Sequence, residues 1–313
     1  MRKLSCEPNQ ALICGQQPRS MRSWEFEEGE EIAPGRQALR LLGGGHRYEA
    51  WLSWDERLRS LVVAKLLRPG QTDDPVAHRA LDGEARLLSR LAHPLLVRSF
   101  GAERDHDRPQ LILEHVDGPR LSTLIRRDGL ILEQVLPLAM NLCSVLHYLA
   151  CERIVHLDVK PRNIIMAGGP RLIDLSVARS LDELGSLRGP VGTDAYMAPE
   201  QCDPERRAEI GSPSDIWGLG ASVHEAFTGR LPYPRATPEE RHPQLAWRPG
   251  SLPGLPTALE GPLRSCLEPR PDDRPTAAEL GDALEPIVDA LPPPRIGRFR
   301  PGGKRMLEQL SGS

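Results

Sequence analysis

The sequence predicts an α+β protein, in which a small strand-rich part with one helix precedes a larger and mainly helical part. Two observations predict this division. Apolar and polar residues alternate around glycines over residues 38–66, as they do in strands joined by tight turns. Further along, apolar residues recur at helical spacing over 133–152, 215–229 and 276–288. We therefore expect a sheet in the first part and packed helices in the second.

In the first part, the sequence pattern predicts a leader, two strands and a helix between those strands. Residues 1–33 are polar, carry a cluster of glutamates and show no sustained periodicity, so we expect a leader without regular structure. SLVVAKLL (60–67) is typical of a buried strand, and QLILEHV (110–116) of another. Between them, a helical stripe of Ala and Leu residues ends at Pro94.

The second part begins with the helix over 133–152. IVHLDVKPRNIIM (154–166) is too interrupted for a helix and predicts a strand, a loop and a strand. RLIDLSVA (171–178) predicts a short strand that ends in a loop. Gly229 is placed to end the helix over 215–229, and Thr276 to cap the last helix. Residues 292–313 form a tail rich in Pro, Gly and Arg.

Composition narrows the class of protein. The 313 residues carry a formal charge of −3, which gives no general attraction to nucleic acid or acidic lipid. None of the six cysteines forms a C-x-x-C pair, so a zinc or thioredoxin-type site has no support. We see no secretory signal, and no window that approaches the roughly 18–20 apolar residues of a membrane helix. We expect a cytoplasmic protein with no nucleic-acid partner and no membrane span.

The lysines are unusually few. Only four of the 40 basic residues are lysine, and two of them, Lys65 and Lys160, lie well inside the chain. Lys65 is on the predicted buried strand, where a charge is costly unless it is paired or meets a ligand. Glu84 on the following helix could pair with it. The alternative is a lysine that extends along a strand edge into solvent.

Acidic and amide side chains gather in two loops of the second part. HLDVKPRN (156–163) combines Asp158, Lys160 and Asn163, which could accept a proton, neutralise phosphate charge and offer an oxygen to a metal. Asp174 follows a short apolar strand and offers a carboxylate suited to Mg²⁺. Either loop alone fits an ordinary hydrogen-bonded turn. Together and in this order, the two loops favour a catalytic site that handles phosphate and a metal ion.

Three glycines, Gly43, Gly44 and Gly45, separate the first two strand-like segments. They could let backbone amides approach a phosphate, although a simple hairpin turn is the commoner explanation of such a run. Tyr48 stands where a G-x-G-x-x-G pattern would have its third glycine.

With these blocks in order, residues 36–288 resemble the eukaryotic-type (Hanks-type) bacterial serine/threonine protein kinases, in an actinobacterial style. The matching blocks are Gly43 and Gly45 of the glycine-rich loop, Val62–Lys65, the helix residue Glu84, His93–Val97, the hinge Leu113–Val116, His156–Asn163, Asp174–Ser176, Gly192–Glu200, Asp215–Gly220 and Asp273–Pro275.

The resemblance implies a bilobal fold, with a small antiparallel β-sheet lobe plus one helix and a larger, mainly helical lobe. It assigns residues 36–115 to the first lobe and 116–288 to the second. Residues 1–35 would be a flexible, acidic leader, and 289–313 a tail.

The resemblance also implies ATP and Mg²⁺ as cofactors and protein Ser/Thr hydroxyls as acceptors. Asp158, Lys160, Lys65 and Glu84 would be catalytic, and Asn163 and Asp174 would hold the metal. The residues expected to bind ATP are Leu42, Gly43, Gly44, Gly45, Ala50, Ala64, Lys65, Leu113, Glu114, Val116 and Asn163. The chain itself is a candidate substrate, at Ser180, Ser186 or Thr193. Asp215 would brace the catalytic loop, and Glu200 would pair with Arg274.

Four residues depart from the family pattern. Leu157 replaces the arginine that usually receives an activation-loop phosphate, so we expect activity that does not depend on such a phosphate. Ser176 replaces a glycine and should restrict its segment, Tyr48 makes the glycine-rich loop bulkier, and Asp194 replaces a proline near the substrate site.

Two alternatives remain. The departures are compatible with an ATP-binding pseudokinase that acts as a scaffold. A small-molecule kinase of the aminoglycoside-phosphotransferase type would share the Asp and Asn arrangement. Proteins of that type generally lack the blocks seen here at Met197–Glu200 and Asp215–Gly220.

Overall fold

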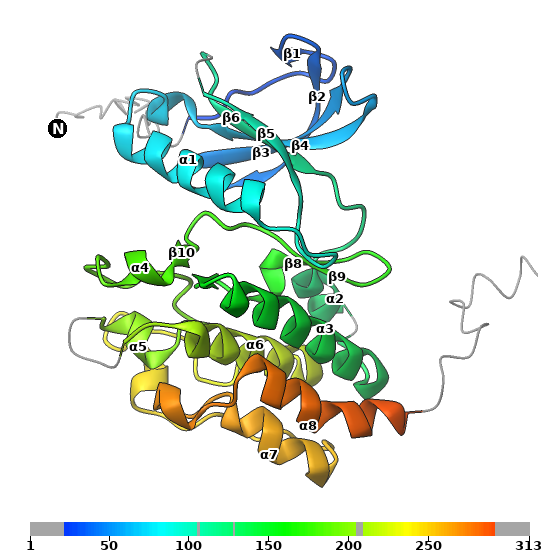
Figure 1. The fold of residues 1–313 in the computed structure, drawn as a ribbon, viewed down its shortest axis with the longest axis vertical. Coiled ribbons are helices and arrows are strands. Elements are labelled where there is room, and N and C mark those ends of the chain that lie inside the picture. The colour runs from blue at the N-terminus through cyan, green and yellow to red at the C-terminus, as the bar shows by residue number, and fades with distance from the viewer. Residues whose placement is uncertain (1–21, 105–106, 128, 205–208, 292–313) are drawn as a thin grey trace, which may run out of the picture. The chain divides into compact units, whose positions relative to one another are not determined.

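The computed structural model describes residues 22–104, 107–127, 129–204 and 209–291 (Figure 1). The chain divides into two compact units. The first comprises the residues up to Ser89 together with Arg98–His115, and the second comprises Arg90–Val97 and the residues from Val116 onward.

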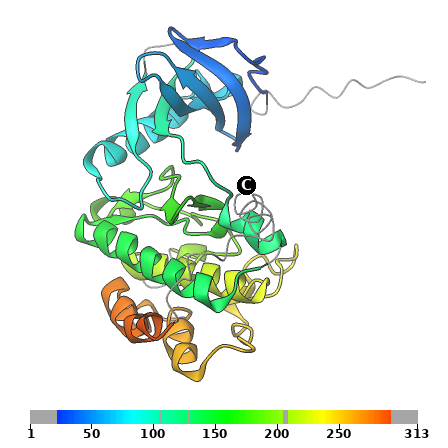
Figure 2. The same cartoon turned by 90° about the vertical axis from the view of Figure 1, so that its right-hand side faces the viewer.

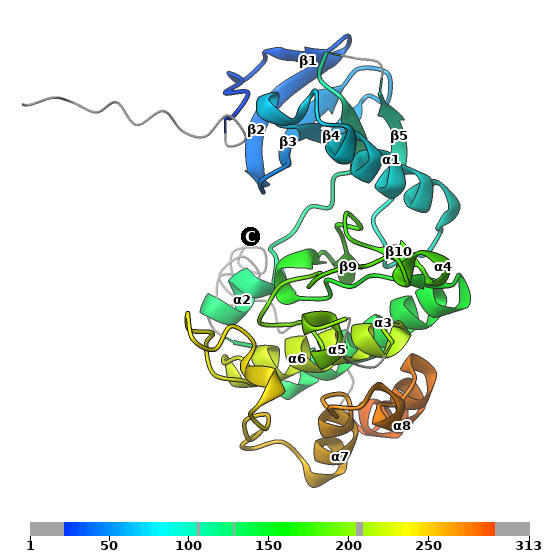
Figure 3. The same ribbon diagram turned by 90° about the vertical axis from the view of Figure 1, so that its left-hand side faces the viewer.

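The first unit is built on one antiparallel sheet of six strands in the order β1-β2-β3-β4-β6-β5. Helix α1 (Pro75–Arg90) lies beside this sheet (Figure 3). The predicted strand over 60–67 is confirmed as β4, and the predicted helix before Pro94 as α1. The strands are β1 (Glu31–Ala33), β2 (Arg36–Gly44), β3 (Tyr48–Asp55), β4 (Ser60–Leu67), β5 (Ser99–Glu103) and β6 (Gln110–Glu114).

The leader is only partly as predicted. Trp24 and Phe26 pack into a cluster with Ile32 of β1 and with Trp51 and Leu66 of the sheet, so residues 22–33 are part of the folded unit. Two aromatic side chains supply the apolar surface that holds this segment, and its glutamates point to solvent. The prediction of a flexible leader is therefore wrong for residues 22–35, and residues 1–21 lie outside the described range.

The second unit consists mainly of helices, with two short strand pairs, β7 with β10 and β8 with β9, and single helical turns between them. Helix α3 (Leu132–Cys151) packs against both α6 (Ser212–Thr228) and α8 (Ala277–Asp289) (Figure 2). The other elements are α2 (Leu121–Arg127), β7 (Ile154–Val155), η3 (Pro161–Asn163), β8 (Ile164–Met166), β9 (Pro170–Leu172), β10 (Arg179–Ser180), α4 (Leu181–Leu184), α5 (Pro199–Cys202), η4 (Pro243–Leu245), α7 (Thr257–Ser265) and η5 (Pro271–Asp273).

The three long helices of the second unit were predicted within three residues of their observed ends, and their caps are the expected ones. Gly229 ends α6 with a left-handed backbone at φ 71°, and Thr276 accepts the N–H of Glu279 at the start of α8. Helices α2 and α7 were missed, because both are short and α7 contains Pro262.

Residues 90–97 belong to the second unit, although they fall inside the range predicted for the first lobe. Leu96 forms a bridge with Leu172, and His93 stacks on Tyr148 with ring centroids 5.1 Å apart. The segment therefore packs on α3 and β9, within its own unit.

Helix α3 contradicts the expectation that no window of the sequence approaches the apolar length of a membrane helix. It is long and apolar enough, by length and composition, to pass as a membrane helix, which the sequence pattern did not predict. Half of its apolar window is buried inside the protein, and a core helix passes the same test.

Candidate active site

The first unit contains a buried ion pair between β4 and α1. Lys65 Nζ lies 2.7 Å from Glu84 Oε2 and 2.9 Å from Oε1. The Glu84 side chain is 0% exposed and that of Lys65 10%, so the two charges compensate each other out of water. The ring of Tyr48 lies against the same ammonium, 4.9 Å from Nζ, and its hydroxyl donates to Ala77 O of α1. Tyr48 is thus directed toward Lys65 and α1.

Strand alternation decides which neighbours share a face with Lys65. Ala50 is directly opposite Lys65 in the β3–β4 register, and Val63 lies two residues before it on β4, so both are on its face. Ala64 points the other way and is fully buried in the cluster of Phe26, Trp51 and Leu66. The structure therefore does not place Ala64 beside Lys65 as the ATP-binding expectation requires, and the residue on the Lys65 face is the half-buried Val63.

The three glycines form the end of the β2–β3 hairpin. Gly43 has φ 139°, a backbone conformation that other residues rarely adopt, and a Cβ added there or at Gly45 would meet nothing within 4 Å. A Cβ at Gly44 would lie 2.5 Å from Tyr48 O, so Gly44 is required for the hairpin to close. Leu42 precedes this turn on β2 and is half-buried.

The predicted hinge residues follow at the end of β6. Leu113 is buried and pairs with Val63 in the β4–β6 register, which places it on the Lys65 face. The Glu114 carboxylate is bound by Arg98 at 3.2 Å. Val116 is buried and is the first residue of the second unit's main segment.

The second unit brings three polar side chains together around one carboxylate. Asp158 Oδ2 accepts from Lys160 Nζ at 2.6 Å and from Asn163 Nδ2 at 3.0 Å, and Oδ1 accepts from the Thr193 hydroxyl at 2.7 Å. Lys160 Nζ also donates to the Thr193 hydroxyl at 2.6 Å. Asp158 is therefore held by three partners, one of them a cation.

Thr193, a candidate for modification, has its hydroxyl bonded to both Asp158 and Lys160 and so belongs to the cluster. Sequence reasoning missed this contact because the two residues are 35 positions apart and no local pattern joins them.

A buried aspartate fixes the backbone of the catalytic loop. Asp215 at the start of α6 accepts the N–H groups of His156 at 2.7 Å and Leu157 at 2.8 Å. Burial raises the pKa of Asp215 to about 6. On the other side, Gln201 donates to Leu157 O at 2.8 Å and to Val191 O at 2.9 Å, a contact that the motif analysis also missed.

Further from the loop, the predicted pair of Glu200 and Arg274 is present and buried. Arg274 Nη1 lies 2.7 Å from Glu200 Oε1, and Nη2 lies 2.9 Å from Oε2, which is a bidentate arrangement. Ser214 of α6 donates to the same carboxylate at 2.7 Å. The pair therefore ties α5 to α6 and to the start of α8.

The donor set near Asp158 fits a hard cation. Asn163 uses its amide nitrogen toward Asp158, which leaves the amide oxygen as the atom available to a metal. Its backbone carbonyl accepts the N–H of Ile173, the residue before Asp174. An amide oxygen and a carboxylate suit Mg²⁺, which keeps several waters or phosphate oxygens of its own. Among the described residues, no three His, Cys, Asp or Glu side chains group as a metal site.

The family model of the protein kinase domain matches residues 37–283. The chain belongs to the protein kinase family. This match confirms the resemblance. The predicted fold class is confirmed as well, because one unit consists of an antiparallel sheet with one helix and the other is mainly helical, as expected of the two kinase lobes.

The kinase domain is similar to bacterial and plant relatives. The chain is 32% identical over 85% of its length to the probable serine/threonine-protein kinase PkwA of Thermomonospora curvata, and 29% identical over 76% of its length to the serine/threonine-protein kinase PkaA of Streptomyces coelicolor. Mitogen-activated protein kinase kinase kinase 3 of Arabidopsis thaliana is 33% identical over 82%. The chain spans 36%, 48% and 46% of the lengths of these three relatives.

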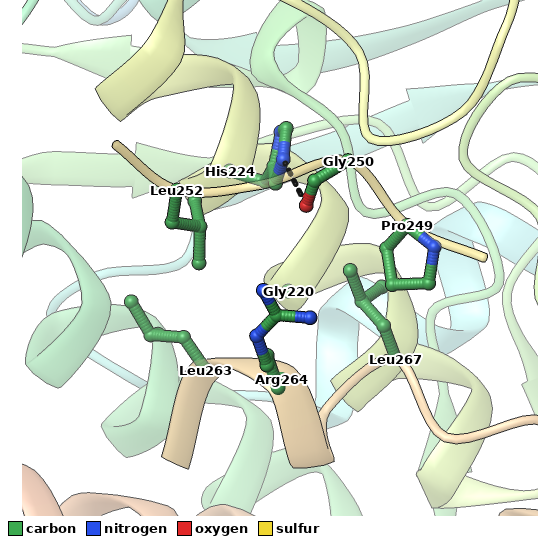
Figure 4. Close-up of a pocket in the computed structure, with 8 residues that line it drawn as sticks. All are labelled: Gly220, His224, Pro249, Gly250, Leu252, Leu263, Arg264 and Leu267. Carbon is green, nitrogen blue, oxygen red and sulfur yellow. Dashed lines mark hydrogen bonds between the residues drawn. The ribbon is translucent and has the colours of Figure 1, made fainter. Parts of the chain in front are cut away.

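The second unit of the kinase domain also has a small pocket, and it is lined by residues other than those of the predicted site. His224 Nε2 contacts Gly250 O at 3.4 Å, and the guanidinium of Arg264 points into the pocket (Figure 4). Burial lowers the pKa of His224. The lining contains none of the predicted site residues and consists of Gly220, His224, Pro249, Gly250, Leu252, Leu263, Arg264 and Leu267.

Proposed function

We propose that this chain transfers the γ-phosphate of ATP to Ser or Thr hydroxyls of protein substrates. The observation that carries the proposal is the Asp158 cluster, in which one carboxylate is held by Lys160, Asn163 and Thr193. Phosphoryl transfer needs mainly positioned charges around the reacting atoms, and these residue types supply them.

The transfer itself makes one bond and breaks one. The acceptor oxygen bonds to the γ-phosphorus while the bond between that phosphorus and the β–γ bridging oxygen breaks, releasing ADP. Asp158 orients the acceptor hydroxyl and takes its proton. Lys160, 2.6 Å from Asp158, is placed to neutralise charge on the transferred phosphoryl group.

Lys65 and Glu84 serve the nucleotide in this proposal. Lys65 would bind the α- and β-phosphates, and Glu84 would hold the ammonium in position. Ala50, Val63 and Leu113 share the Lys65 face of the sheet and would form the apolar surface for the adenine.

Asn163 and Asp174 are the residues that would hold Mg²⁺. The ion would neutralise the phosphate charge that develops during transfer. Asn163 is positioned for this by Asp158, and Asp174 by the hydrogen bond that joins Ile173 to Asn163.

We further propose that activity does not require a phosphate on the activation segment, which we define as residues 174–200. Leu157, where related kinases have an arginine, is 3% exposed. It packs in an apolar cluster that includes five residues of this segment. The members of this activation-segment cluster are Val155, Leu157, Val177, Leu181, Leu184, Leu187, Val191 and Ile210. Apolar packing would thus hold the segment where other kinases use an ion pair.

Transfer of label from γ-labelled ATP tests the proposal. The full chain is incubated with Mg²⁺ and a generic basic protein, beside the Asp158→Asn variant, which keeps the size of the side chain. We expect label on Ser or Thr in the wild-type reaction and none with the variant. Ser186 is exposed and Ser180 half-buried, so both remain candidate positions on the chain itself. ATP binding without any transfer would support a pseudokinase scaffold in its place.

A further inference from the structure

The leader segment, which we define as residues 22–33, covers the face of the sheet opposite Lys65. Phe26 lies edge-on to Trp51 with ring centroids 5.2 Å apart, and Trp24 stacks on Phe26 at 6.0 Å. The indole of Trp24 donates to Leu67 O at the end of β4, at 2.8 Å. This segment is therefore fixed to β3 and β4 by both apolar contact and hydrogen bonding.

A buried carboxylate lies beneath the leader segment. The Glu49 side chain, on β3 next to the glycine hairpin, is 0% exposed. It accepts from the Trp51 indole at 3.0 Å, from the Trp24 backbone N–H at 3.4 Å and from Arg68 Nη1 at 2.9 Å. A buried carboxylate needs such partners, and Arg68 supplies the compensating charge.

The same guanidinium reaches the glycine hairpin, which we define as residues 43–48. Arg68 Nε donates to Gly45 O at 2.7 Å, Nη1 donates to Arg22 O at 3.2 Å, and the backbone N–H donates to Arg47 O at 2.9 Å. A guanidinium is planar and its donors are fixed relative to one another. A shift of the leader segment or of Glu49 must therefore be felt at Gly45.

The hairpin depends on such contacts for its orientation. Side chains at Gly43 and Gly45 would meet no neighbours within 4 Å, so packing does not hold this part of the turn. The Gly45 carbonyl is fixed by Arg68, and its N–H by Tyr48 O at 3.0 Å. Backbone amides can bind phosphate only when the turn that presents them is held in one conformation.

We propose that Arg68 is a positioning residue, which couples docking of the leader segment to the conformation of the glycine hairpin and so to ATP affinity. This inference rests on the proposed function, because it takes the hairpin to bind the ATP phosphates. In this proposal Trp24, which precedes the range matched by the family model, affects ATP binding through Glu49 and Arg68.

The test compares full-length Arg68→Met, Trp24→Ala and the double variant with wild type. Kd for ATP, KM for ATP, KM for the protein substrate and Tm are measured for each. We expect Arg68→Met to raise Kd and KM for ATP about tenfold, the loss typical of hydrogen bonds from a charged donor, and to leave the protein-substrate KM unchanged. Trp24→Ala should weaken ATP binding in the wild-type background and add nothing in the Arg68→Met background, although it lowers Tm in both.

Two further variants keep the test decisive. Arg68→Lys retains the charge beside Glu49 but cannot span its three acceptors as a fork, so it should fold and still bind ATP more weakly than wild type. Arg40→Met, the matched control, removes an exposed arginine from β2 and should change neither the Kd nor the KM for ATP.

The outcomes separate the inference from the proposed function. If wild type binds ATP and both Arg68 variants bind it equally well, the coupling is overturned and the kinase proposal stands. The coupling is also overturned if Trp24→Ala weakens ATP binding by the same factor with and without Arg68. A wild-type chain that binds no ATP would overturn the kinase proposal, and the coupling with it.

Discussion

The hydroxyl of Thr193 donates a 2.7 Å hydrogen bond to Asp158 Oδ1, and it accepts from Lys160 Nζ at 2.6 Å. A residue of the activation segment is thus hydrogen-bonded directly to the carboxylate that we propose as the proton acceptor. Because Gly192 precedes Thr193 with φ 118°, and a Cβ there would lie 2.6 Å from Leu157 O, the segment can approach the loop this closely only with glycine at that position.

Thr193→Val should therefore lower kcat. Valine keeps the shape of threonine but removes both hydrogen bonds, so Asp158 and Lys160 lose a shared partner. We expect kcat to fall about 10- to 100-fold, the range for a misplaced catalytic group, with little change in the KM for ATP. Steady-state kinetics check this, with Thr193→Ser as the matched control because it retains the hydroxyl. Equal kcat values for the valine and serine variants would contradict the assignment.

The buried pair of Lys65 and Glu84 predicts a non-additive effect on stability. Glu84→Leu leaves the Lys65 ammonium buried without its partner, which typically costs about 3–5 kcal/mol of unfolding free energy. Replacing both residues, as in Lys65→Met with Glu84→Leu, removes the stranded charge and should recover most of that loss. Urea unfolding of the two variants tests the difference. A double variant that is less stable than Glu84→Leu would show that the pair's charge is not the dominant cost.

The motifs predicted these groups because each is local in sequence: the loop 156–163 and the strand 60–67 hold their functional residues within a few positions. Contacts between distant segments were predicted only where the family resemblance implies both partners, as for Glu200 with Arg274 and Asp215 with the loop 156–163. The bond between Asp158 and Thr193 and the bonds from Gln201 to Leu157 and Val191 depend on how the activation segment folds back, which no periodicity encodes.

Two differences from the predictions have a simple physical cause. The resemblance placed Ala64 in the ATP site through the block Val62–Lys65, but adjacent residues of a strand face opposite sides, and Ala64 lies in the cluster with Phe26 and Trp51. The leader was expected to be flexible because it is polar and acidic and shows no sustained periodicity. Trp24, Phe26 and Ile32 pack into the apolar cluster with Trp51, and the Trp24 indole donates to Leu67 O, so residues 22–33 lie on the sheet.

Asp215 predicts a pH-dependent difference in stability. Burial raises its pKa from 3.8 to about 6, so between these pH values the native protein holds a proton here that the unfolded chain has lost. Protonation therefore favours the native state as the pH falls. Relative to Asp215→Asn, which cannot titrate, the unfolding free energy of wild type should rise by about 2–3 kcal/mol as the pH falls from well above 6 toward 4.

Urea unfolding of wild type and Asp215→Asn at several pH values measures this difference. Other titrating groups are common to both proteins and cancel in the comparison. A difference that stays constant from neutral pH down to about pH 4 would mean that Asp215 has an ordinary pKa in the native protein.

The burial of Leu157 predicts that an arginine at this position destabilises the kinase domain. Leu157→Arg would place a charge among the side chains of the activation-segment cluster, such as Leu184 and Val191, and should cost about 2–5 kcal/mol of unfolding free energy. Leu157→Met conserves volume and polarity and should cost less than about 1.5 kcal/mol. If, as we propose, apolar packing holds the segment without a phosphate, phosphatase treatment should leave the activity of wild type and Leu157→Met unchanged. An arginine variant that is as stable as wild type and becomes active only when phosphorylated would show that the segment can be held by an ion pair after all, and that the buried leucine is not what makes phosphorylation dispensable.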